Sequence, residues 1–372
     1  MKLAIIIAAI SSRSYVKAAV DVGFEVIAID SFADVDTQKL AKEVLQVPVN
    51  GDQFDAVTLL QTLQKIVLSS NLTYLGFCFG AGFEAQPELL TEIAQLIPLI
   101  GNAAEVVKNT KMPRVFFGIC DTLKMAYPGT QYQRPIEINW LQKCIGGSGG
   151  WHIKSISPLS LPLNFPKVNQ VYYQKKQAGT PISCLFLTDG KRTQLIGFNE
   201  QWCEPTATQH YRYGGAVSHV ALPETVRLII EQFVQAATVK LGLKGLNSAD
   251  FLVEYEDVYA LEINPRLSAT LDLYRAKNGD LFVAHVAACL DKLEAWPTIE
   301  KQSRAHHIIY ANSNLQVPPA MDWPDWVLDI PQPNSKIAAG SPICTAVAAA
   351  RTAKLAKKKV LQLALSLSQQ LF

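Results

Sequence analysis

Three oxygen-bearing side chains lie close together on two adjacent strand patterns. The segment ADFLVEY carries Asp250, and DVYALEINPR carries Glu262 and Asn264 two residues apart, hence on one face of a strand. Carboxylate and amide oxygens from neighbouring strands are ligands that Mg²⁺ or Mn²⁺ takes, and nucleotide phosphates complete the shell. Solvent-facing strand residues are the alternative, but apolar residues fill the alternating positions and Asn-Pro-Arg is an unusual strand ending. The pattern therefore predicts a magnesium site.

A strand-borne lysine stands directly before a glycine-rich loop in WLQKCIGGSGGWHI. The residues of this second element are Lys143, Gly146, Gly147, Ser148, Gly149 and Gly150. Backbone N–H groups of such a loop can cradle a phosphate while the lysine supplies a positive charge. The glycines alone would also fit a surface loop that binds nothing.

Two further groups of residues follow apolar strand patterns in the first hundred residues. Ser12 and Arg13 come after the first pattern, and FGAGFEAQPELL places Gly80, Gly82 and Glu84 after a later one. Ligands of open α/β sheets bind at the carboxyl ends of the strands. Ser12 and Arg13 are thus candidates for binding an anionic group of a substrate, and Gly82 and Glu84 for orienting a substrate amine. Helix capping is the alternative for both groups.

The elements around these residues divide the chain into an α/β front and an α+β body. Residues 1 to about 100 alternate short apolar runs with amphipathic stretches, which is typical of a doubly wound parallel sheet. The first turn is Ser-Ser-Arg rather than G-x-G-x-x-G, so dinucleotide chemistry is not indicated. A β-rich region begins near Ile136, a helix is expected over 224–241 and another over 348–371.

The composition is that of an ordinary globular protein. Hydrophobic residues make up 49% of the 372 residues and charged ones 18%, with a net charge of +2, so nucleic-acid binding is not expected. No run approaches the length of a membrane span, and the opening apolar run is interpreted as a strand rather than a signal peptide. The seven cysteines form no C-x-x-C pair. They predict reduced core residues and a cytoplasmic location.

The combined motifs resemble those of the ATP-grasp superfamily. ADF followed by EINPR is similar to its metal-binding strand pair, and KCIGGSGG to its lysine and glycine-rich loop. The resemblance implies an ATP-grasp fold with a Rossmann-like front domain, a small lobe and a large antiparallel-sheet lobe. The implied units are a Rossmann-like pre-ATP-grasp domain over 1–104, the small lobe over 105–173, the large lobe over 174–312 and a C-terminal segment over 313–372 that packs on the body.

The same resemblance implies roles for particular residues. Lys111 and Lys143 would hold the nucleotide phosphates, and Arg266 would face the γ-phosphate during transfer. The backbone of a hinge would meet the adenine of ATP, at Gln174, Lys175, Lys176 and Gln177. The sequence departs from the family pattern where a ribose-binding carboxylate and a second basic residue often stand, since Pro181 and Ser248 occupy those places.

The activity implied is an ADP-forming ligase that requires ATP and Mg²⁺ and joins a carboxylate to an amine through an acyl phosphate. Its expected partners are small-molecule carboxylate and amine substrates, with a homodimer left open. The front domain is similar to carboligases related to biotin carboxylase, some of which accompany synthesis of the one-carbon carriers tetrahydromethanopterin and methanofuran. Two alternatives stay open: a carboxylase that makes carboxyphosphate from bicarbonate, and a nucleotide-binding protein without turnover.

Overall fold

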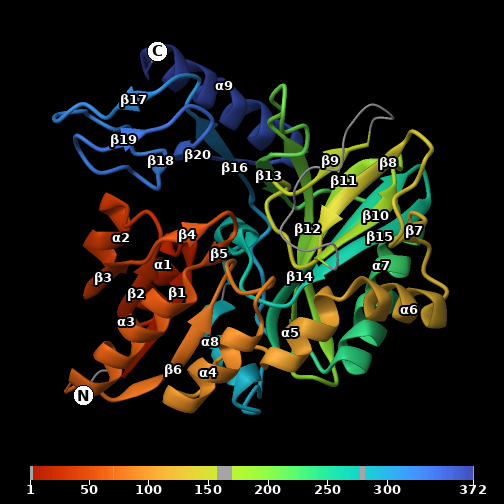
Figure 1. Cartoon of the computed structure of the whole chain (residues 1–372), viewed down its shortest axis with the longest axis horizontal. Coiled ribbons are helices and arrows are strands. Elements are labelled where there is room, and N and C mark those ends of the chain that lie inside the picture. Colours follow the sequence, from red (N-terminus) through yellow and green to blue (C-terminus); the bar gives the residue numbers. More distant parts are fainter. Residues whose placement is uncertain (1–2, 70, 157–169, 277–280, 372) are drawn as a thin grey trace.

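The computed structural model describes residues 3–69, 71–156, 170–276 and 281–371. A parallel sheet near the N-terminus, a small antiparallel sheet and a long antiparallel sheet make up most of the molecule (Figure 1). The long sheet runs from near the small sheet to the C-terminal segment, which supplies its last two strands, and the parallel sheet lies below that segment. The predicted combination of an α/β front and an α+β body is confirmed. Within the described residues, no helix combines the length and apolar character that crossing a membrane requires.

The N-terminal sheet has four parallel strands in the order β3-β2-β1-β6. They are β1 (Ala4–Ala9), β2 (Glu25–Asp30), β3 (Glu43–Gln46) and β6 (Tyr74–Phe79). All six residues of β1 are buried, as expected for a strand covered on both faces. A short hairpin, β4 (Val49–Asn50) with β5 (Gln53–Phe54), lies beside the sheet.

Helices cover both faces of this sheet. They are α1 (Arg13–Asp21), α2 (Val35–Leu40), α3 (Ala56–Ser69), α4 (Glu88–Leu96) and α8 (Leu281–Cys289). Alternate residues of β1 point to opposite faces, so Ile5 and Ile7 pack with α1 and α8, while Ile6 packs with α3 and α4. The helix α8 follows the large-lobe strand β15 in the chain but packs on the N-terminal sheet. It therefore connects the large lobe to that sheet.

The small lobe carries two helices and a four-stranded antiparallel sheet in the order β7-β10-β8-β9. Its elements are α5 (Ala104–Lys111), α6 (Pro113–Leu123), β7 (Thr130–Gln131), β8 (Trp140–Cys144), β9 (Lys154–Ser155) and β10 (Val171–Lys175). The expected division at 173/174 falls inside β10. Gln174 and Lys175 therefore belong to the small-lobe sheet rather than to the large lobe.

The large sheet has eight antiparallel strands in the order β15-β14-β11-β12-β13-β16-β20-β18. They are β11 (Thr180–Thr188), β12 (Thr193–Cys203), β13 (Tyr213–Ser218), β14 (Gly245–Glu254), β15 (Asp257–Asn264), β16 (Ser303–Tyr310), β18 (Val327–Leu328) and β20 (Pro342–Ala350). The helix α7 (Glu224–Leu241) packs on one face and ends at Gly242, which is left-handed (φ 70°), as predicted. A short 3-10 helix, η2 (Ala269–Leu273), follows β15.

The C-terminal segment extends the large sheet instead of only packing against the body. Strand β20 pairs along β16, β18 adds the last strand, and α9 (Ala353–Leu371) covers them. A small pair, β17 (Leu315–Gln316) with β19 (Lys336–Ile337), accompanies them. The helix expected from residue 348 begins at 353, because 348–350 pair with β16. Sheet pairing across the chain thus overrides local helix propensity.

Candidate functional site

Asp250, Glu262 and Asn264 lie together at one end of the β14–β15 hairpin. Asp250 is directly opposite Glu262 in the strand register, and Asn264 Nδ2 donates to Asp250 Oδ2 at 2.8 Å. Lys111, at the end of α5, reaches into the group: its Nζ lies 2.8 Å from Glu262 Oε2 and 2.6 Å from Asn264 Oδ1. The structure therefore brings the three predicted metal ligands and one predicted phosphate-binding lysine into a single cluster.

The charges in this cluster depend on one another. Burial opposes ionisation of Glu262, but the ammonium groups of Lys111 and Lys143 outweigh it and lower the pKa of Glu262. Burial and the Glu262 charge raise the pKa of Asp250. Two carboxylates this close ionise together only when cations accompany them. The described residues contain no group of three or more His, Cys, Asp or Glu side chains that could hold a metal ion, so a metal here relies on the Asn264 oxygen and on ligands from outside the chain.

Lys143 and Gln174 form a buried pair across β8 and β10. Lys143 Nζ donates to Gln174 Oε1 at 2.9 Å, and burial lowers the pKa of Lys143. Gln174 Nε2 is also buried, and it finds no hydrogen-bond partner among the described residues. An orphaned buried donor costs about 1–3 kcal/mol, so a bound acceptor atom would stabilise this position.

The glycine-rich loop between β8 and β9 lies between the N-terminal domain and the large lobe. A Cβ atom at Gly146 would come within 2.4 Å of the Glu84 carbonyl oxygen, and one at Gly150 within 1.8 Å of the Tyr211 carbonyl oxygen. The Ser148 N–H donates to an Asp52 carboxylate oxygen at 2.7 Å. Only glycine fits these close approaches, and one loop amide already binds an anionic oxygen.

The predicted hinge residues lie at the end of β10 and just beyond it. The N–H groups of Lys175 and Lys176 donate to the carbonyl oxygens of Gly129 and Asn139. Gln177 Nε2 donates to Glu254 Oε2 at 3.3 Å, which brings a carboxylate to the hinge from the end of β14.

The two positions that depart from the family pattern lie inside the large sheet. Pro181 pairs with Leu252, and Ser248 pairs with Asn264. Glu254, at the end of β14, is a carboxylate near the hinge, where it accepts a hydrogen bond from Gln177. The sequence does not indicate this proximity, because Gln177 and Glu254 are far apart in the chain.

Arg266 and Glu84 form a buried ion pair between the end of β15 and the turn after β6. Arg266 Nε lies 2.7 Å from Glu84 Oε1, and Glu84 Oε2 accepts the N–H groups of Gly82 and Phe83. Burial opposes ionisation of Glu84, but Arg266 and Lys111 outweigh it and lower the pKa of Glu84. Two residues predicted separately, one for catalysis and one for an amine, are therefore in direct contact.

Ser12 and Arg13, at the start of α1, bind carboxylates of the protein itself. Ser12 N and Oγ both donate to Asp30 Oδ2 at 2.6 Å. Arg13 is buried between Asp329 and Asp272, at 2.7 and 2.8 Å. These bonds hold both side chains within the fold and do not bring them to the metal-ligand cluster, and the buried Arg13 Nη1 has no partner among the described residues. Gly80 likewise extends the sheet, since its N–H donates to the Ala8 carbonyl oxygen.

The site includes one side chain that no sequence motif indicated. Gln201, on β12, donates from Nε2 to Asp250 Oδ1 at 3.2 Å. In the sheet, Asp250 is opposite Ser183 of β11, which is opposite Asn199 of β12. Gln201 therefore reaches Asp250 across an intervening strand, and its role depends on sheet order rather than on a local pattern.

Comparison with known proteins agrees with this architecture. Residues 120–270 match the family model of the ATP-grasp domain. L-amino acid ligase from Bacillus licheniformis superposes with a TM-score of 0.71 at 12% identity, covering 97% of each chain. The chain has an ATP-grasp fold. Biotin carboxylase from Campylobacter jejuni, in complex with a β,γ-ATP compound, superposes with a TM-score of 0.71 at 15% identity, covering 96% of this chain and 89% of its own. No curated protein sequence matches the chain.

A third similar structure is the biotin carboxylase domain of Hydrogenobacter thermophilus 2-oxoglutarate carboxylase, solved with MgADP, ADP and bicarbonate. It superposes with a TM-score of 0.71 at 11% identity, covering 96% of this chain and 88% of its own. The residues of the present chain fit such a nucleotide and metal chemically. Hard oxygens converge at the hairpin, Lys111 and Lys143 supply positive charge, and Gln174 offers an orphaned donor.

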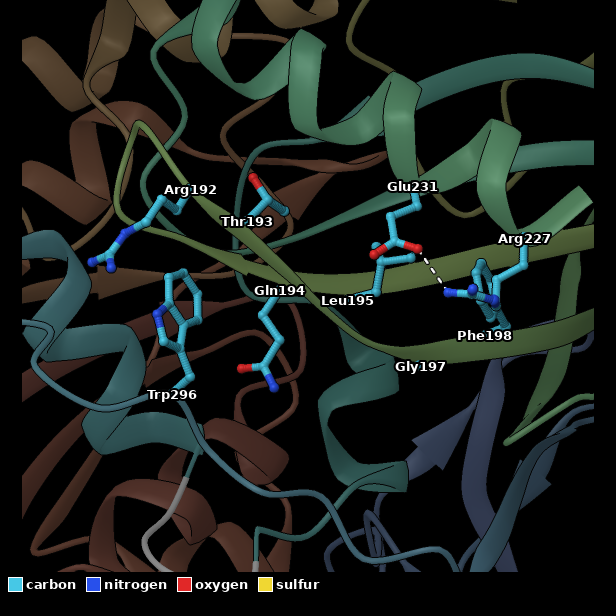
Figure 2. A pocket seen from close by; sticks show the side chains of 9 residues that line it. All are labelled: Arg192, Thr193, Gln194, Leu195, Gly197, Phe198, Arg227, Glu231 and Trp296. Atoms are coloured by element: carbon cyan, nitrogen blue, oxygen red, sulfur yellow. Dashed lines mark hydrogen bonds and ion pairs between the residues drawn. The ribbon is translucent and has the colours of Figure 1, made fainter. Parts of the chain in front are cut away.

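An open cavity in the large lobe lies away from this cluster. About 610 Å³ in volume, it lies beside β12 and α7 and is lined by Arg192, Thr193, Gln194, Leu195, Gly197, Phe198, Arg227, Glu231 and Trp296 (Figure 2). The guanidinium groups of Arg192 and Arg227 are paired with Asp189, Glu224 and Glu231 on the surface. None of the predicted site residues lines this cavity.

Proposed function

We propose that this protein is an ATP-dependent, magnesium-requiring ligase that activates a carboxylate as an acyl phosphate and joins it to an amine. The observation that carries the proposal is the cluster of Asp250, Glu262 and Asn264 around the Lys111 ammonium. A protein that only bound nucleotide would have little use for two partly buried carboxylates, an amide and a lysine arranged in this way. The ATP-grasp fold of the whole chain supports the same proposal.

In this proposal ATP lies between the small and large lobes. Lys111 and Lys143 bind its phosphates, the amides of the loop from Gly146 to Gly150 lie over them, and Gln174 Nε2 donates to the nucleotide. A magnesium ion held by Asp250, Glu262 and Asn264 would offset charge on the phosphate oxygens during transfer. The loop packs closely against the backbones of Glu84 and Tyr211. Such packing would keep water away from an acyl phosphate, which water would otherwise hydrolyse.

Arg266 and Glu84 lie where the two substrates would meet. Arg266 presents a guanidinium fixed by Glu84 and by the Leu267 carbonyl oxygen. A planar, fixed donor can bind the oxygens of the transferring phosphoryl group. The carboxylate attacks the γ-phosphorus, ADP leaves, and the amine then displaces phosphate from the acyl phosphate to give an amide.

ADP release against a panel of acceptors tests the proposal. The panel contains the amino acids singly and in pairs, glutamate with pterin and furan precursors, and bicarbonate, each with Mg-ATP. The precursors are included because the front domain resembles enzymes that accompany one-carbon carrier synthesis. We expect ADP release that needs both a carboxylate and an amine and that yields an amide detectable by mass.

Two other outcomes would replace the proposal. ADP release with bicarbonate and no amine would identify a carboxylase. Stabilisation against heat by Mg-ATP without ADP release would identify a binding protein, because a ligand that favours the folded state raises the unfolding temperature whether or not it reacts. Chelation with EDTA is the control in both assays.

A further inference from the structure

The end of the glycine-rich loop, which belongs to the small lobe, is attached to the large lobe. The Tyr213 N–H, at the start of β13, donates to the Gly149 carbonyl oxygen at 3.1 Å. The next residue, Gly150, packs so closely on the Tyr211 carbonyl oxygen that a Cβ atom would come within 1.8 Å of it. A loop held only by a few backbone contacts opens easily, so the side chains next to these glycines decide how firmly it is held.

Trp151, the residue directly after these glycines, adds an aromatic contact to the same region of the large lobe. Its ring centroid is 6.1 Å from that of Tyr310, the last residue of β16, and the ring planes are inclined at 68°, in the edge-on arrangement that aromatic pairs favour. Trp151 is 37% exposed and is not part of the hydrophobic core clusters of the described residues. Core packing therefore does not explain why a large aromatic side chain follows the loop.

Tyr310 is itself fixed in position. The Arg212 guanidinium carbon lies 3.7 Å from the Tyr310 ring centroid, and the Tyr310 hydroxyl donates to the Tyr213 carbonyl oxygen at 2.8 Å. Arg212 is buried, and its Nε and Nη1 donate to the carbonyl oxygens of Glu204 and Gly340. A guanidinium stacked on an aromatic ring away from water attracts that ring and stabilises its position. The loop therefore meets a ring that the large lobe already holds in place.

The same loop lies beside the residues of the proposed reaction. Lys143 stands at the end of the strand that leads into it, and Gly146 packs on the Glu84 carbonyl oxygen. The Glu84 side chain in turn holds Arg266. Attachment of the loop to the large lobe would therefore control whether water reaches an acyl phosphate formed at these residues.

We propose that Trp151, Tyr310 and Arg212 form an aromatic clasp that keeps the glycine-rich loop on the large lobe until the amine has reacted, an inference that rests on the proposed ligase function. All three are positioning residues that act through the loop. With the clasp closed, the amine nitrogen bonds to the acyl carbon as the bond from that carbon to the phosphate oxygen breaks. With the clasp open, water attacks in place of the amine, and the acyl phosphate returns to carboxylate and phosphate with release of a proton. ATP is then converted to ADP and phosphate without an amide.

Two measurements on the same variants test the clasp. The first counts the amides formed per ADP released, with the carboxylate and amine that give the fastest ADP release. The second follows hydrogen exchange of peptides 146–153 and 211–218 with Mg²⁺ and a non-hydrolysable ATP analogue, because the Tyr213 N–H reports directly on its bond to the loop. The variants are Trp151→Leu and Trp151→Phe. The matched control is Trp296→Leu, since Trp296 has a similar contact with an arginine, Arg192 at 5.4 Å, but lies at the cavity away from the site.

We expect Trp151→Leu to raise the share of ADP released without an amide by about 3- to 10-fold, which is what loss of one aromatic pair predicts for the ratio of open to closed loop. Both peptides should exchange faster by a similar factor, because local opening exposes their amides. Trp151→Phe keeps an aromatic ring at this position and should stay close to wild type, as should Trp296→Leu. A residue needed only for the fold would lower the unfolding temperature and leave the number of amides per ADP unchanged.

The outcomes separate the clasp from the ligase function. A wild-type protein that releases no ADP with any carboxylate and amine overturns the ligase function, and the exchange measurement then still decides whether Trp151 holds the loop. Wild-type exchange in Trp151→Leu overturns the clasp alone. Faster exchange with an unchanged number of amides per ADP overturns its role in protecting the acyl phosphate. Equal losses in Trp151→Phe and Trp151→Leu contradict the aromatic contact as the cause.

Discussion

Lys111 and Arg13 are both buried cations that lie among carboxylates, but the carboxylates around them are held in different ways. Beside Lys111, Glu262 has a side chain that is 37% exposed, and Asp250 is held by amide side chains. Beside Arg13, Asp36 accepts the backbone N–H groups of residues 329 and 330. A cluster held by side chains can exchange a partner for a ligand, whereas one held by the backbone fixes the fold.

The location of each cluster agrees with this difference. Arg13, in the N-terminal domain, forms ion pairs with Asp272 of η2 and Asp329 of the C-terminal segment. Its bonds therefore connect three parts of the chain that are far apart in sequence. Lys111 joins the small lobe to one hairpin of the large sheet. Changes in the Lys111 cluster should therefore act on turnover, and changes in the Arg13 cluster on stability.

The largest effect is expected from Glu262→Ala or Asn264→Ala. Each removes a proposed metal ligand at a strand end, and neither residue belongs to the hydrophobic core clusters. Turnover should fall by about 1000-fold or more, because a metal ion supplies several kcal/mol of transition-state stabilisation and each 1.36 kcal/mol is a factor of ten. ADP release with magnesium measures the loss, and Glu256→Ala in the exposed turn of the same hairpin is the control. Wild-type turnover in either variant would remove the metal assignment.

The proximity of Asp250, Glu262 and Asn264 is only partly visible in the sequence, and their role as metal ligands stays a prediction. Alternation places Glu262 and Asn264 on one face of β15, but a register shift between Asp250 and Phe251 is what brings Asp250 opposite Glu262. The Arg266–Glu84 pair joins residues far apart in the chain, and only the order of sheets and domains brings them together. Gln201 reaches Asp250 across another strand for the same reason.

The fold shows the same limit of local patterns. The parallel front sheet and the helix over 224–241 follow from periodicity and a glycine stop, and both are confirmed. The sequence predicts a short strand near Ile343 to Val347, which lies within β20, but it does not show that this strand pairs with β16 and so extends the large sheet. Arg13 was predicted to bind substrate for a similar reason: its position after a strand is visible in the sequence, but its carboxylate partners at 272 and 329 are not.

The second prediction concerns Arg13→Met. This change leaves the partly buried Asp272 and Asp329 without the Arg13 guanidinium, and only Asp272 keeps a second cation nearby, Arg275 at 3.7 Å. Removing one partner of a buried ion pair typically costs about 3 kcal/mol or more. Urea unfolding should therefore show a loss of about that size, while the ADP release of the remaining folded protein stays near wild type. A stability equal to wild type, or a loss of turnover without loss of stability, would contradict the structural role of Arg13.

The third prediction concerns Arg266→Lys. A lysine cannot keep both the Glu84 ion pair and a second, planar set of donors toward a phosphoryl group. The rate should fall by about 100-fold, as for loss of one fixed oxyanion donor, while ATP affinity changes much less. Steady-state kinetics combined with an equilibrium measurement of ATP binding checks this. A rate loss matched by equally weakened ATP binding would leave Arg266 as a binding residue only.

The smallest effect is expected from Asp34→Asn. Asp34 is the carboxylate near Arg13 whose pKa is raised to about 9. Asp34 is 6% exposed. Burial, together with repulsion from Asp329, Asp30 and Asp36, raises its pKa to about 9 and outweighs the attraction of Arg13. Between its unfolded pKa of about 3.9 and this folded value, the native state binds a proton that the unfolded state has released. Its contribution to stability is therefore complete below the unfolded pKa and is lost as pH rises toward 9.

An asparagine has the shape of the protonated acid and no proton to lose, so Asp34→Asn should remove this pH dependence. The stability difference between variant and wild type should grow in favour of the variant by at least about 1 kcal/mol between pH 5 and pH 8.5, since each pKa unit is 1.36 kcal/mol. Asp36→Asn is the matched control: its carboxylate accepts two backbone N–H groups, so that variant should be destabilised. A stability difference for Asp34→Asn that is constant with pH would mean that Asp34 is ionised in the folded protein. Asp34 would then carry a charge beside Arg13, as Asp272 and Asp329 do.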